Sequence, residues 1–174
     1  AWSITVEYDN GTPSDPPVIP GIEYTGSTFQ LIGSNVSTDT INVPDNGTIT
    51  DINVTISGST DGGLNYISFK LISPYGTIVD LVDWSEWSGS TFSLTTFDDE
   101  ASNQITGTTA PYYGSFQPEG NLSDLDQEEM QGEWTLWAYN SNNFYTNVSA
   151  WSITVEYDNG TPSDPPVIPG IEYT

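Results

Sequence analysis

The chain has 174 residues, and 24 Asp and Glu side chains stand against a single basic one, Lys70, for a formal net charge of −23. This charge repels phosphate backbones and anionic lipid, so nucleic acid and membrane surfaces are excluded as partners. Cys and His are absent, which excludes disulfide frameworks, thiol nucleophiles and His-dependent catalytic triads. No run of 18 apolar residues occurs, so we expect no membrane insertion.

The two ends of the chain are identical in sequence. The first 25 residues, AWSITVEYDNGTPSDPPVIPGIEYT, return without a substitution at residues 150–174, 149 residues further on. A period of that size fits one domain with its own core. The sequence therefore predicts a head-to-tail repeat, built from covalent tandem copies or from separate subunits. Residues 1–8 would be the terminal strand of the preceding unit, and residues 158–174 the start of the next linker.

Residues 9–25 are rich in proline and glycine. This composition cannot continue a helix or a central strand. Proline at such density favours an extended polyproline II spacer of about 3.1 Å per residue. We therefore predict a semi-rigid linker over residues 9–25.

Residues 26–157 consist of short runs of β-branched and aromatic residues, broken by Gly, Asn, Asp and Pro. In residues 48–57, Ile52, Val54 and Ile56 alternate with polar residues and are expected to face the core. The pattern predicts an all-β fold, an antiparallel jelly-roll-like β-sandwich of about seven to nine strands. The expected strands are 28–32, 40–43, 48–57, 66–73, 78–82, 91–97, 114–116, 132–139 and 148–157. Further expected core residues are Ile67, Phe69, Leu71, Trp134, Leu136, Trp151, Ile153 and Val155.

The motifs VPDNGTITDINVTIS, LISPYGT, TTFDDEA, GSFQPEGNLSDL, GEWTLWAYN and VSAWSITVEY follow one another over residues 40–157. Their order and spacing resemble the P domain, also called the Homo B domain. That module follows the catalytic domain of kexin-like and furin-like proprotein convertases and occurs in many bacterial secreted and cell-surface proteins. The resemblance implies a jelly-roll type of sandwich, in agreement with the periodicity.

The resemblance also implies calcium binding, because P domains often hold Ca²⁺ through acidic side chains. Two positions depart from the family pattern: the Gly-Asp-Leu stretch is replaced by residues 65–67, and Asn140 stands where an Asp usually ends the Trp-containing strand. The candidate ligands are Asp98, Asp99 and Glu100 in the FDDEA match, with Asp61, Asp83 and Asp126 as neighbours. The alternative to a calcium site is that Asp98 caps a turn and its neighbours face water.

Asn-x-Ser/Thr triplets are frequent in this chain. They predict N-glycosylated surface loops of a secreted protein. The seven candidate sites are Asn10, Asn35, Asn46, Asn53, Asn121, Asn147 and Asn159.

Carboxylate chemistry is the one catalytic class that the composition leaves open. A glycosidase needs two acids that flank a cleft, and Glu86, Glu128, Glu129 and Glu133 are candidates. So many acids produce accidental pairs, and a small repeated sandwich is a poor place for a deep cleft. We therefore predict that the protein is not an enzyme.

Aromatic residues in two loops suggest a second class of function. Trp84 and Trp87 flank an acid in one Ser/Gly-rich loop, and Tyr112 and Tyr113 lie together in another. Such rings could form a platform for sugar contact. The alternative is that they cover the ends of the sandwich or pack against the next unit.

The duplicated AWSITVEY segment is predicted to be the closing strand of the sandwich. It either closes its own domain or is donated into the sheet of a neighbour, as in strand-addition fibres. The apolar residues of this inter-unit strand are Trp2, Ile4 and Val6 in the first copy and Trp151, Ile153 and Val155 in the second.

These features together predict a structural repeat unit of an extracellular, glycosylated fibre or cell-surface filament, joined head to tail through the Pro-rich linker. Its partners would be copies of itself and glycans, and Ca²⁺ its one candidate cofactor. The alternatives are a carbohydrate-binding or adhesive module, or a stabilising appendage of a secreted protease.

Overall fold

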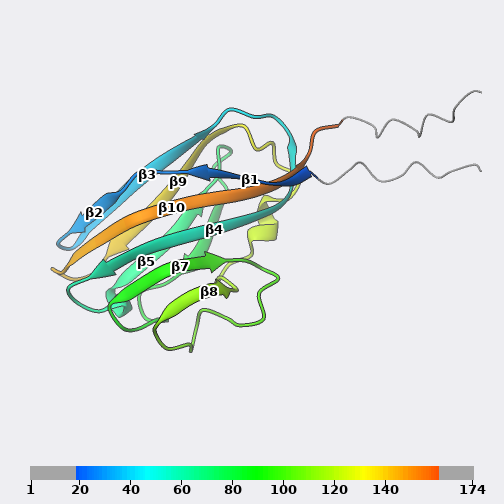
Figure 1. Cartoon of the computed structure of the whole chain (residues 1–174). Coiled ribbons are helices and arrows are strands. Elements are labelled where there is room, and N and C mark those ends of the chain that lie inside the picture. Colours follow the sequence, from blue (N-terminus) through cyan, green and yellow to red (C-terminus); the bar gives the residue numbers. More distant parts are fainter. Residues whose placement is uncertain (1–18, 161–174) are drawn as a thin grey trace, which may run out of the picture.

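Two β-sheets lie face to face in the computed structural model, which describes residues 19–160 (Figure 1). The six-stranded sheet, here sheet A, has the order β1-β10-β4-β7-β8, with β2 also paired to β10. The four-stranded sheet, sheet B, has the order β3-β9-β5-β6. The strands of sheet A are β1 (Ile19–Thr25), β2 (Phe29–Ile32), β4 (Thr48–Thr60), β7 (Thr91–Phe97), β8 (Tyr112–Phe116) and β10 (Tyr145–Asp158). Those of sheet B are β3 (Asn35–Val43), β5 (Ile67–Ile72), β6 (Ile78–Val82) and β9 (Gly132–Asn140). Two short 3-10 helices, η1 (Leu64–Tyr66) and η2 (Leu122–Leu125), lie in connections.

The core lies between the sheets and follows the alternation of the strands. In β4, Ile52, Val54 and Ile56 are at most 1% exposed, while the residues between them are half-buried on the outer face. The predicted all-β sandwich is thus confirmed, and so is the burial of the residues assigned to its core. Full burial of one such aliphatic side chain contributes about 1.5–3 kcal/mol.

Aromatic rings fill one end of the core. Trp87 contacts Phe69, Phe92 and Tyr112 with ring centroids 5.5–5.8 Å apart. The Trp87 Nε1–H donates to the Ile67 carbonyl at 2.8 Å, so this buried polar group is satisfied. The loop that carries Trp87 therefore belongs to the core.

The structure has ten strands among the described residues where about seven to nine were expected, and it corrects the sequence-based prediction in two further places. Residues 19–25, expected to end the linker, form β1, and the strand has a register irregularity between Ile19 and Ile22, next to Pro20. Proline is tolerated at such a position because β1 is an edge strand. In addition, β7 and β8 run parallel, whereas all pairs were expected to be antiparallel.

The chain enters and leaves the sandwich at one end. Ile19, the first residue of β1, pairs with Tyr157 near the end of β10, because the two strands are antiparallel. We call this end, where β1 begins and β10 ends, the joint pole (Figure 1). Any neighbouring unit in a tandem chain is therefore attached there.

Candidate functional site

The second copy of the repeated segment lies inside sheet A of its own domain. Strand β10 pairs with β4 on one side and with β1 and β2 on the other. Trp151, Ile153 and Val155 are at most 2% exposed and face the core. Within residues 19–160 these three residues pack in their own domain, which agrees with the alternative that the strand closes its own sandwich. Trp2, Ile4 and Val6 lie outside the described residues.

Strand β1 covers the open side of β10. Ile22 pairs with Val155 and Tyr24 with Ile153, and both β1 side chains are half-buried against the core. The Tyr24 hydroxyl donates to the Asp45 Oδ2 at 2.8 Å. Burial and the hydrogen-bonded Asp45 carboxylate raise the pKa of Tyr24, so it stays a donor at neutral pH. The first strand of the domain is thus fixed along the last one.

Asp39 of β3 connects the two sheets at this edge. Its Oδ2 accepts hydrogen bonds from the Trp151 Nε1–H and from the Ser27 backbone N–H, both at 2.7 Å. Each of these bonds has a charged acceptor and is therefore stronger than a neutral one. A single carboxylate thus links sheet B, β10 and the segment between β1 and β2.

Two glycines make room for aromatic rings of the repeated segment. A Cβ on Gly26 would lie 1.9 Å from Trp151 Nε1, and one on Gly47 would lie 2.1 Å from Tyr157 Cδ2. The Gly26 N–H also donates to the Trp151 carbonyl at 3.0 Å. No larger residue fits at either position without displacing a ring. Sequence reasoning missed Asp39, Gly26 and Gly47, because their partners are distant in the chain.

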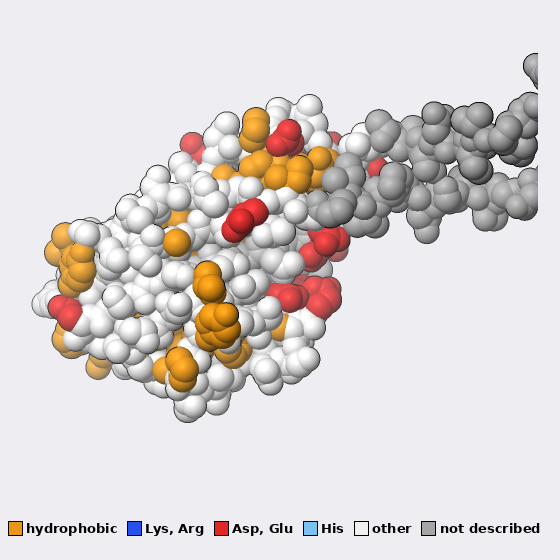
Figure 2. All heavy atoms as spheres, in the orientation of Figure 1, with side chains coloured by type: hydrophobic (Ala, Val, Ile, Leu, Met, Phe, Trp, Pro, Cys, Tyr) orange, Lys and Arg blue, Asp and Glu red, His pale blue; other side chains and the backbone are white. Residues whose placement is uncertain are grey.

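Carboxylates gather near the joint pole. Asp51 of β4 and Glu156 of β10 are direct cross-strand partners, and like charges in that position repel. Asp98 and Asp126 are close enough to Asp51 to act on its titration. Figure 2 shows acidic side chains on this side of the molecule, next to the end where the chain leaves. The joint pole therefore carries a high density of negative charge.

The predicted calcium ligands are only partly brought together. Asp99 accepts hydrogen bonds from the Leu122 and Ser123 N–H groups at 3.0 and 2.9 Å, and Asp98 accepts the Glu100 N–H at 2.8 Å. Burial and the charge of the nearby Asp99 raise the pKa of Asp126. Within residues 19–160, no three Asp or Glu side chains form a metal-binding group.

Asp61 does not belong with these acids. It lies ten residues beyond Asp51 along β4, roughly 30 Å away at the usual rise of a strand, and accepts the Tyr145 N–H at 2.7 Å. Asp83, the other suggested neighbour, accepts hydrogen bonds from Ser68 Oγ and the Trp84 N–H. Calcium at Asp98, Asp99, Glu100 and Asp126 stays a prediction.

The acidic cluster predicts that mild acidification stabilises the fold. Burial and the charge of Glu156 raise the pKa of Asp51. Desolvation, a hydrogen bond with Asp98 and the charge of Asp51 raise that of Glu100. A carboxyl whose pKa is higher in the folded state binds its proton more tightly there, so stability rises as pH falls from 7 toward about 4. We expect the melting temperature to increase over this range.

Asp51→Asn separates this effect from general charge screening. The variant keeps an oxygen to accept the Asn53 Nδ2–H bond, which is 2.9 Å long in the structure. We expect it to melt at higher temperature than the parent at pH 7 and to gain less on acidification. Added Ca²⁺ would raise the melting temperature if the cluster binds it, and EDTA would reverse the change. A melting temperature that falls between pH 7 and pH 5 would contradict the account.

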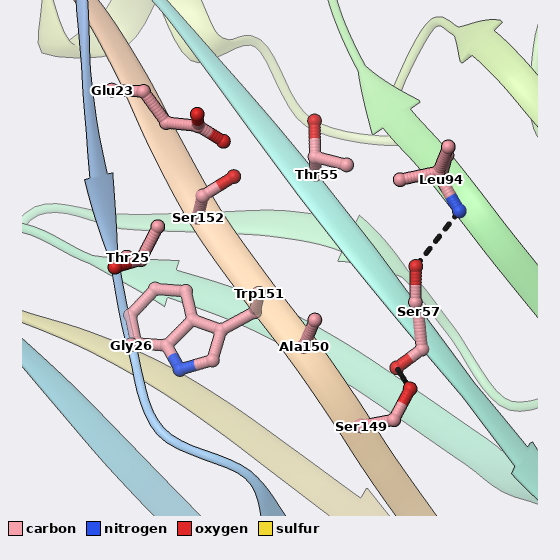
Figure 3. A pocket seen from close by; sticks show the side chains of 10 residues that line it. All are labelled: Glu23, Thr25, Gly26, Thr55, Ser57, Leu94, Ser149, Ala150, Trp151 and Ser152. Carbon is pink, nitrogen blue, oxygen red and sulfur yellow. Dashed lines mark hydrogen bonds between the residues drawn. The ribbon is translucent and has the colours of Figure 1, made fainter.

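Sheet A carries a shallow depression on its outer face. It has a volume of about 180 Å³ and lies over β1, β10, β4 and β7 (Figure 3). Glu23 is its one carboxylate, and the remaining lining is mostly Thr, Ser and small apolar residues. Ligand pockets usually have 300–1,000 Å³, and acid–base catalysis of glycoside cleavage needs a second acid. The depression therefore does not have the features of an active site.

The structure rules out Trp87 and Tyr112 as members of the suggested aromatic platform and agrees with the alternative that rings fill the end of the sandwich. Trp87 and Tyr112 are 2% and 0% exposed and contact each other inside the core. The Tyr112 hydroxyl donates to the Thr108 carbonyl and accepts the Ser88 N–H, so it is satisfied internally. Only Trp84 and Tyr113, at 46% and 69%, are exposed. The physical reason is that the loop of Trp87 folds inward, while Tyr112 is the first residue of β8 and faces the core.

The predicted glycosylation sites differ in accessibility. Asn35, Asn46, Asn121 and Asn159 are exposed, and Asn10 lies outside the described residues. Asn53 and Asn147 are half-buried within strands. The Asn53 amide donates to Asp51, which makes it the least suitable acceptor of a glycan. None of the helices in residues 19–160 has the length and apolar character needed to span a membrane.

No protein-family model and no curated protein matches the chain. The P-domain resemblance therefore stays a prediction. The chain is similar to one in the crystal structure of the Aeromonas sobria serine protease with the chaperone ORF2, with 14% identity over 83% of this chain and a TM-score of 0.50. The structure of the Aeromonas sobria serine protease gives 15% identity over 83% and a TM-score of 0.47. The chain spans 28% of the length of each. At 14% identity, the likeness to the chain in the complex shows a similar fold and nothing more.

Proposed function

We propose that this chain is a non-catalytic β-sandwich module of an extracellular protein, and that it acts by holding its neighbouring domains through the joint pole. The observation that carries the proposal is the repeated segment. Residues 150–158 of its second copy form most of the inner strand β10, which pairs with β1 and β4 of the same unit, and this supports a repeat of closed units.

The geometry of the joint pole determines how such units would be arranged. Nine residues, 159–167, separate the end of β10 from residue 168, where the sequence of β1 returns. Nine residues extend over at most about 30 Å. The body of the sandwich is longer, because the 14 residues of β10 extend over roughly 46 Å. The joint poles of successive units would therefore lie close together along the polypeptide, and each sandwich would project sideways from the line of linkers.

In this arrangement the sandwiches project from the sides of a filament and are not stacked end to end along its axis. Negative charge at each pole favours separation of adjacent bodies, since the carboxylates of neighbouring poles repel across the short linker. Glycans on the exposed Asn46 or Asn121 would add to this separation. Strand donation is not needed for cohesion, because β1 and β10 of one unit pair with each other.

A second version has the module as the stabilising appendage of a secreted protease. It is supported by the fold likeness to part of the chain of the Aeromonas sobria serine protease complex. Nothing in the present sequence supplies a catalytic Ser-His-Asp set, because His is absent. The two versions share the same mode of action and differ in the neighbour, which is another copy in the first and a catalytic domain in the second.

Limited proteolysis of the complete protein shows whether the neighbouring domain is another copy of this module or a catalytic domain. We expect a protease to cut the Pro-rich linkers before the paired strands. Tandem copies would give a ladder of bands that differ by one period of 149 residues. A single resistant module released from a larger, catalytically active fragment would support the protease version and overturn the filament version. Release of fragments cut within β10 would contradict both.

A further inference from the structure

Strand β9 carries two aromatic side chains on the outer face of sheet B. Trp134, Leu136 and Ala138 point into the core and are fully buried, so Trp137 and Tyr139 lie on the opposite face, where both are half-buried. Their ring centroids are 6.0 Å apart and their planes differ by 27°, so the rings form a stacked pair. We call this pair the β9 aromatic strip.

The strip is bordered by polar groups of the adjacent strands. Trp137 pairs with Thr38 of β3 and with Lys70 of β5. The Lys70 ammonium lies 5.6 Å from the centre of the Trp137 ring and 2.5 Å from Asp80 Oδ1. The Lys70 side chain, the single Lys or Arg of the protein, thus lies over part of the Trp137 ring.

The polar atoms of the strip are available for a ligand. Within residues 19–160, neither the Trp137 Nε1–H nor the Tyr139 hydroxyl has a hydrogen-bond partner, whereas the buried Trp87 and Trp134 indoles each have one. Aromatic side chains with an apolar face and a polar tip are suited to surfaces that contact apolar and polar groups together. The strip therefore combines flat apolar area with free donors.

We infer that the β9 aromatic strip is a binding site for a neutral polysaccharide. A sugar ring presents C–H groups on its face and hydroxyls on its rim, which match the stacked rings and the donors and acceptors of Thr38, Lys70 and Asp80. A net charge of −23 repels acidic glycans. A protein partner is less well matched, because a specific interface needs about 800 Å² per side around an apolar centre. Apolar Val36 lies opposite Tyr139, but Thr38, Thr135 and Lys70 next to Trp137 are polar. This inference is independent of the identity of the neighbouring domain.

Native gel electrophoresis of the whole chain through gels that contain soluble β-glucan, mannan, xylan or glycol chitin tests the inference. We expect retardation by at least one of these polymers. Trp137→Ala should weaken the affinity about tenfold, and Trp137→Phe, which keeps a ring without the N–H, should weaken it less. Trp84→Ala and Tyr113→Ala are matched controls, because they remove exposed aromatic rings elsewhere and should leave retardation unchanged. Thermal melting of each variant confirms that it is folded.

Three results would overturn the inference. The first is migration unaffected by all four polymers. The second is an equal loss of retardation in Trp84→Ala and Trp137→Ala. The third is concentration-dependent self-association in analytical ultracentrifugation that Trp137→Ala abolishes, which would make the face a protein interface.

Discussion

Replacing Asp39 by alanine is expected to lower the free energy of unfolding by about 3 kcal/mol, because one carboxylate oxygen is the acceptor for two separate donors. The change leaves the Trp151 indole N–H and the Ser27 N–H without their partner. Both donors belong to the edge where β1 meets β10, so the loss should also loosen β1. Urea denaturation followed by tryptophan fluorescence measures the change.

Asp39→Asn is the matched control for this prediction. The amide keeps one oxygen in the position of the acceptor and removes the negative charge. It should cost about 1 kcal/mol, the difference between a charged and a neutral acceptor. An equal loss for the two variants would show that charge, and not the shared acceptor, is what holds the edge.

Replacing Gly26 by alanine is expected to destabilise the domain by a similar amount, about 3 kcal/mol. The added methyl group would be 1.9 Å from the Trp151 indole nitrogen, so the ring must leave its position or the β1–β2 segment must move. Figure 3 shows the indole lying directly beside the Gly26 backbone. Either movement strains the hydrogen bonds of Asp39. Thermal unfolding measures the loss.

Ser27→Ala is the control for Gly26→Ala, since the Ser27 contact with Asp39 uses the backbone N–H, which alanine retains. This neighbour should change stability by less than about 0.5 kcal/mol, as exposed substitutions usually do. If Gly26→Ala were as mild as Ser27→Ala, the close contact between Gly26 and Trp151 would not exist in solution.

The regular strands could be predicted from the sequence because their alternation is a local property. Strands β6 and β7 begin and end at the residues expected, and β4 and β9 place their alternating apolar residues in the core. The role of AWSITVEY as the closing strand was implied by the P-domain resemblance. These strands are identified by the alternation of apolar and polar residues alone, and tertiary contacts do not change which face of the strand is apolar.

Strand β1 could not be recognised because its composition resembles that of the linker. Pro20 and Gly21 argue against a strand when they are considered locally, yet an edge strand with a register irregularity accepts both. The alternation of Ile22 and Tyr24 was the available signal. Its strength is low because only two apolar residues carry it.

The site predictions failed where they depended on contacts between distant segments. The sequence left open whether Trp87 and Tyr112 form an exposed platform or fill the end of the sandwich, and both are buried, Tyr112 as the first residue of β8. Trp137 and Tyr139 were overlooked although their outward position follows from the alternation of β9. Asp61 is separated from Asp98 by most of the length of β4, a distance that only the strand pairing reveals.

The central claim is that the unit is closed, with β1 and β10 of the same repeat paired, and disulfide trapping tests it most directly. The chain contains no Cys, so an introduced pair reports one contact. Glu23 and Thr154 are cross-strand partners, whose Cα atoms in an antiparallel pair are about 5 Å apart, within disulfide range. Glu172 is the copy of Glu23 in the second repeat of the segment. We predict rapid intramolecular oxidation of Glu23→Cys/Thr154→Cys and at least about tenfold slower oxidation of Glu172→Cys/Thr154→Cys. Faster oxidation of the second pair would contradict the account, because β10 would then take the β1 segment of the following unit.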